Sequence, residues 1–117
     1  MNFAYSAKAQ DYISRLQAFM EQEVYPAEKA YYAGFSHSPD HTKWQQPEIM
    51  ESLKAKAKAA GLWNLFSPHA EHGLNNADYA PLAEITGRSF IAPEVFNCNA
   101  PDTGNMEVLI KYGSPEQ

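Results

Sequence analysis

The 117-residue chain carries 9 lysines and arginines against 14 aspartates and glutamates, which gives a formal net charge of -5 without any basic stripe. This balance argues against a surface for nucleic-acid phosphates or an anionic membrane, and the apolar runs are too short to insert into a bilayer. A single cysteine excludes an internal disulfide and favours a reducing compartment, namely the cytoplasm, or the mitochondrion or peroxisome in a eukaryote. The length is sufficient for one domain with a modest core.

The first third of the chain predicts a long helix followed by a shorter one. Ser6 is placed to cap a helix that runs to about Val24, because its apolar residues recur near the helical period. That stripe consists of Ala9, Tyr12, Ile13, Leu16, Phe19, Met20 and Val24. Pro26 either ends this helix or starts a second one that covers Ala27 to Ala33.

A loop and a third helix follow. Residues 34–46 have no apolar period and predict an exposed loop, from which Trp44 is expected to fold back onto the body. Pro47 opens the third helix, and Gly61 stops it. The inward face of this helix is expected to contain Ile49, Met50, Leu53, Ala57 and Ala60.

The next segment is a short apolar connection, residues 62–66, which is too apolar to lie in water. Residues 67–76 predict another loop, and Asn76 is expected to cap a fourth helix from Ala77 to about Ser89. Its buried side is expected to hold Tyr79, Leu82, Ala83, Ile85 and Thr86. Because no alternating run of β-branched or aromatic residues supports a sheet, we predict an all-α bundle of about five to six helices.

The last predicted helical unit runs from Ala92 to Gly113, and its middle is unusual. Pro101 should either kink this helix or break it, with Asn99 then capping the second half. On an unbroken helix, Val95, Asn99 and Thr103 would share one face that is small and weakly polar. Such a face gives either room for a ligand or a close approach for another helix.

Metal and catalytic motifs are weak in this sequence. Four histidines fall in the two predicted loops, His37 and His41 in the first and His69 and His72 in the second, and turn-rich sequence favours solvated side chains over metal ligands. Cys98 has no base beside it in the sequence and is expected to act as a small buried hydrophobe. The sequence contains no phosphate-binding glycine loop and no hydrolase or zinc-protease motif.

Three separated blocks of sequence resemble the amino-terminal helical domain of the acyl-CoA dehydrogenase family. They read GLWNLFSP at Gly61–Pro68, YAPLAEITGRS at Tyr79–Ser89 and APEVFNCNAPDTGNMEVL at Ala92–Leu109. The closing YGSPEQ at Tyr112–Gln117 resembles the point at which that family turns into its next helix. The blocks occur in the family's order and spacing, so the resemblance covers essentially the whole chain, residues 1–117.

The resemblance implies a flavoprotein that contains FAD and converts an acyl-CoA into the trans-2-enoyl-CoA. It also implies a homo-oligomer that passes electrons to a second flavoprotein. The catalytic base and most FAD contacts would belong to a middle β-domain and a carboxyl-terminal helical domain outside residues 1–117. Within these residues, the resemblance implies that Val95, Phe96, Asn99, Ala100 and Thr103 face the acyl channel.

Two hypotheses therefore remain open. In the first, the chain is a truncated amino-terminal domain of such a dehydrogenase, inactive by itself, because Ser114 and Pro115 would open a helix that has no body. Exposed apolar patches are then expected where other domains would pack. In the second, the chain is a stand-alone helical module that binds a ligand or a partner and catalyses nothing.

Overall fold

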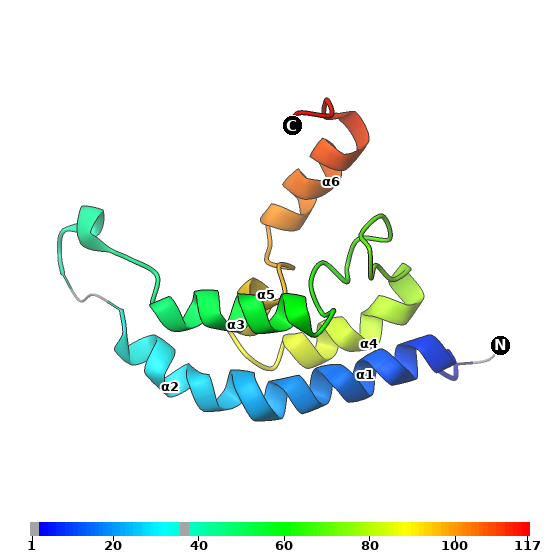
Figure 1. Ribbon diagram of the computed structural model, residues 1–117, viewed down its shortest axis with the longest axis horizontal. Coiled ribbons are helices and arrows are strands. Elements are labelled where there is room, and N and C mark those ends of the chain that lie inside the picture. Colours follow the sequence, from blue (N-terminus) through cyan, green and yellow to red (C-terminus); the bar gives the residue numbers. More distant parts are fainter. Residues whose placement is uncertain (1–2, 36–37) are drawn as a thin grey trace.

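The computed structural model describes residues 3–35 and 38–117. Within these residues all regular elements are helical, which confirms the predicted fold class. Figure 1 shows most helices in one layered body, from which the last helix projects. The elements are α1 (Ala7–Phe19), a π-helical segment (Met20–Val24), α2 (Tyr25–Ala33), a 3-10 turn (His41–Lys43), α3 (Glu48–Ala59), α4 (Asn76–Thr86), α5 (Ala92–Val95) and α6 (Asp102–Tyr112).

The amino-terminal helices form one continuous rod along the body (Figure 1). As predicted, Ser6 caps its start, because the Ser6 hydroxyl accepts a hydrogen bond of 3.0 Å from the Ala9 N–H. Pro26 lies in the first turn of α2, so it opens a helical segment, which is the second of the two alternatives. The π-helical segment before it joins α1 to α2, so the rod continues without a break.

The core lies between this rod and three helices that cover it. α1 packs against α4, α2 against α3, and α3 against α5. The predicted apolar stripe faces inward, since Leu16 of α1 and Met20 and Val24 of the π-helical segment are at most 1% exposed. Met50, Leu53 and Ala57 of α3 are also buried, and Ile49 and Ala60 pack at the edge of the core.

The apolar connection after α3 is confirmed as part of the core. Gly61 ends the helix in the left-handed region at φ +66°, and the chain then turns inward. Leu62 and Leu65 are 1% and 4% exposed. No helix among the described residues is long and apolar enough to cross a membrane.

Two local predictions were wrong. Trp44 does not fold back onto the body; it is 63% exposed, and its Nε1 donates to the Ser38 carbonyl at 2.9 Å within its own loop. This loop extends past the ends of α2 and α3, away from the body (Figure 1). The cap of α4 is Asn75 in place of Asn76, because the Asn75 side chain accepts from the Asp78 N–H at 2.9 Å.

Candidate functional site

The segment that was expected to carry the site is broken into two helices. α5 ends at Val95, and α6 begins at Asp102 after a connection that contains Pro101. Asn97 adopts the left-handed conformation at φ 56°, a region that asparagine enters more readily than most residues. Of the two predicted alternatives for Pro101, the structure therefore shows the break. The predicted cap was wrong, because Pro101 and not Asn99 is at the cap position of α6, and no side chain of the described residues caps the start of this helix.

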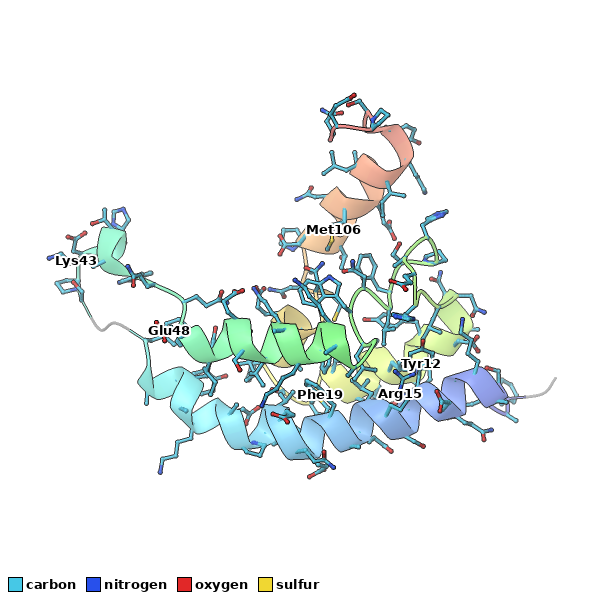
Figure 2. The ribbon with its side chains drawn as sticks, viewed as in Figure 1. Tyr12, Arg15, Phe19, Lys43, Glu48 and Met106 are labelled. Atoms are coloured by element: carbon cyan, nitrogen blue, oxygen red, sulfur yellow. The ribbon has the colours of Figure 1, made fainter. Side chains whose placement is uncertain are left out.

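The Asn97 side chain fastens this connection to the body. Its Nδ2 donates to Oδ1 of Asn64 at 2.6 Å and contacts the sulfur of Met106 at 3.4 Å. Asn64 also has a positive φ, of 59°, and its N–H donates to the Phe96 carbonyl at 3.2 Å. Met106 lies at the base of α6, where that helix leaves the body (Figure 2). Asn97 therefore links Asn64 of the body to Met106 of α6.

The break separates the five residues that were expected to face the acyl channel. Val95 and Phe96 are 0% and 3% exposed and belong to the core. Asn99 and Ala100 are exposed in the connection, and Thr103 is half-buried in the first turn of α6. Neither residue presents an open surface in this chain, and the Phe96 ring packs edge-on against Phe19, so a contact of Val95 or Phe96 with substrate stays a prediction.

The other three residues line an open hollow of about 510 Å³ beside α6. Its small or apolar lining residues are Phe66, Ala83, Gly87, Pro93, Ala100 and Gly104, and its polar ones are Tyr79, Thr86, Cys98, Asn99, Thr103 and Glu107. α4 supplies one wall, and α6 with the preceding connection supplies the other. The volume falls in the range of small-ligand sites.

Polar groups from α4 form part of the hollow's floor. The hydroxyls of Tyr79 and Thr86 hydrogen-bond the Cys98 thiol. Burial raises the pKa of Cys98, and these two bonds lower it by less than burial raises it, so the thiol remains protonated at neutral pH. Burial together with the neighbouring Cys98 also raises the pKa of Tyr79. The floor is therefore uncharged and suited to a ligand without charge.

Sequence reasoning placed the α4 residues in the core and missed their part in the hollow. Tyr79 and Thr86 are seven residues apart and therefore share one helix face, which is the signal that linked them. Ala83 lies beside them on the same helix but is exposed, so its prediction as buried was wrong. It lines the hollow with the others.

The hollow does not fit the phosphate groups of a dinucleotide. Neither lysine nor arginine lines it, and Glu107 adds a negative charge that would repel a pyrophosphate. No residue of this chain is therefore assigned to FAD. The described residues also contain no group of three or more His, Cys, Asp or Glu placed to hold a metal, and His37 lies outside them.

Known proteins resemble this chain strongly over nearly its whole length. It is 54% identical over 98% of its residues to "Acyl-CoA dehydrogenase family member 11" of Rattus norvegicus, and 55% identical over 100% to "Probable acyl-CoA dehydrogenase FadE2" of Mycobacterium tuberculosis. The solved structure of a proposed acyl-CoA dehydrogenase from Mycobacterium abscessus superposes with a TM-score of 0.85 at 52% identity over 97% of this chain. No family model matches the chain.

The chain spans a small part of each of these relatives. It covers 15% of the rat protein, 28% of the Mycobacterium tuberculosis protein and 30% of the solved chain. Sequence and structure agree, since both place the similarity over almost all of this chain. The predicted resemblance is confirmed: the chain belongs, as one helical segment, to the acyl-CoA dehydrogenase family.

Proposed function

We propose that the whole protein is an FAD-dependent acyl-CoA dehydrogenase and that this chain is its amino-terminal helical domain. The observation that carries the proposal is identity of 50–55% to proteins of that name over nearly the whole chain. The reaction would convert an acyl-CoA into the trans-2-enoyl-CoA. The catalytic base and the FAD contacts would lie in parts of the protein beyond these residues.

The role of this chain in the reaction would be to form one wall of the acyl channel. Asn99, Ala100 and Thr103 face the hollow, and its uncharged floor can exclude water from an acyl tail without placing a charge against it. The coenzyme A phosphates would stay outside, because no cation lines the hollow. The predicted contact of Val95 and Phe96 with substrate is not part of the proposal.

The proposal extends to the partners of a complete enzyme. As in the resemblance, we expect FAD as cofactor, a second flavoprotein as electron acceptor and a homo-oligomeric assembly. Apolar residues on α6 are exposed here, with Val108 at 57% and Ile110 at 49%, which supports packing against further protein. A reducing compartment is favoured by the single cysteine.

The first experiment determines the gene sequence beyond the codon for Gln117 and purifies the complete protein. We expect flavin absorbance and oxidation of acyl-CoA coupled to a dye acceptor. A reading frame that stops at Gln117, or a complete protein that oxidises no acyl-CoA, would contradict the proposal. The former result would favour the stand-alone binding module.

A second experiment tests the hollow itself in the complete protein. Thr103→Phe should fill the space beside α6 and lower kcat/KM for medium and long acyl-CoA roughly tenfold or more. Asn105→Phe is the matched control, because Asn105 is on the same helix, is exposed and does not line the hollow. Equal losses in both variants would show that Thr103 has no special part in binding the tail.

A further inference from the structure

A single charged side chain lines the hollow, that of Glu107. Glu107 is four residues after Thr103 and therefore lies on the same face of α6, one turn further from the body. It also borders a second cavity, of about 180 Å³, between α6 and the loop that follows Leu65. Glu107 thus stands at the boundary between the two spaces.

The second cavity differs from the hollow in its chemistry. Ser67, His69, Asn76 and Lys111 line it together with Glu107, Pro68 and Ile110. A hydrocarbon tail that continued along α6 beyond Thr103 would reach the Glu107 carboxylate first and these polar groups next. Each step would remove water from groups that gain nothing from contact with methylenes.

The Glu107 carboxylate has no countercharge that would reduce this penalty. Among the described residues, no ion pair includes it, and Lys111 on the next turn is not within salt-bridge distance. A charge without a partner is especially unfavourable to desolvate, because nothing in the protein replaces the lost water.

We infer that Glu107 ends the acyl path along α6 and sets the longest unbranched tail that the enzyme accepts. The inference rests on the proposed function and deepens it by naming the residue that limits the substrate. Tails that stop short of position 107 contact only the uncharged residues of the hollow. Longer tails must either bury an unpaired carboxylate or leave their ends in water.

The test measures kcat/KM of the complete protein over a series of saturated acyl-CoA thioesters. Glu107→Leu should shift the profile toward longer substrates, so that kcat/KM for long relative to short substrates rises roughly fourfold for each methylene newly buried past position 107. Glu107→Gln removes the charge but keeps the side-chain size, so it should show a smaller shift in the same direction. Because Gln is nearly isosteric, it keeps the test usable if the leucine variant folds poorly.

The control is Asn105→Leu, which puts the same new side chain on α6 away from the hollow and should leave the profile unchanged. The readout is the ratio of kcat/KM between long and short substrates, which general destabilisation of the enzyme would not alter. An unchanged ratio in both Glu107 variants of an active enzyme would overturn the inference alone. A parent enzyme inactive on every acyl-CoA would overturn the proposed function, and the inference with it.

Discussion

The body and α6 are built from similar residues but differ completely in burial. In the body, Leu16 of α1 and Met50 of α3 point inward and are at most 1% exposed. In α6 no residue is buried, and Val108, Leu109 and Ile110 are 57%, 49% and 49% exposed. Figure 1 shows that α6 leaves the body, away from the helices that pack against one another.

The contrast shows that an apolar residue on a helix is buried only where another element packs against that helix. The core of α1 exists because α4 lies against it. α6 is held mainly at its base, through Asn97 and Met106, while its outer turns have no such neighbour. Exposed apolar residues, which the sequence predicted, are found on this helix at Val108, Leu109, Ile110 and Tyr112, and also elsewhere, for example at Phe90.

The largest expected effect tests the contrast directly. Leu16→Ala should lower the free energy of unfolding of the chain by about 3 kcal/mol, because it leaves a cavity at a site that is 1% exposed. Leu109→Ala removes the same atoms from a site that is 49% exposed and should cost less than about 0.5 kcal/mol. Urea denaturation followed by circular dichroism measures both. Similar losses would mean that α6 packs against the body more than the structure shows.

A smaller effect is expected at the junction between the two regions. Asn97→Ala removes the bond to Asn64 and puts alanine at a φ of 56°, so it should cost about 2 kcal/mol. Asn97→Gly removes the bond but tolerates the backbone conformation and should cost about 1 kcal/mol. In both variants the amides of α6 should exchange hydrogen faster, while those of α1 change little. Unchanged exchange in α6 would refute the role of Asn97 as its anchor.

The smallest effect concerns the polar floor shared by α4 and the connection to α6. Burial raises the pKa of both Cys98 and Tyr79 in the folded chain, so above pH 9 the folded state retains protons that the unfolded state releases. Stability should therefore fall as the pH rises above the ordinary thiol pKa of 9.0. A Tyr79→Phe, Cys98→Ala double variant should show a shallower fall in denaturation experiments between pH 8 and 10. A fall as steep as in the parent would exclude these two groups as its cause.

The sequence by itself determined that the chain is helical and where most of the helices begin and end. Ser6 as a cap, the inward stripe of α1, the stop at Gly61 and the inward face of α3 follow from side-chain chemistry and helical period. These features depend on residues within a few turns of one another. The resemblance to the acyl-CoA dehydrogenase family could also be found from the sequence, because three blocks match that family in their residues and in their order.

The tertiary structure alone decided which residues form the hollow. Periodicity put Val95, Asn99 and Thr103 on one face, but the chain breaks between Val95 and Asn99, so the first enters the core and the others face outward. Tyr79 joins them from a distant stretch of the sequence, on α4. Helical period describes neighbours along one unbroken helix, whereas a hollow depends on the direction in which separate helices leave a turn.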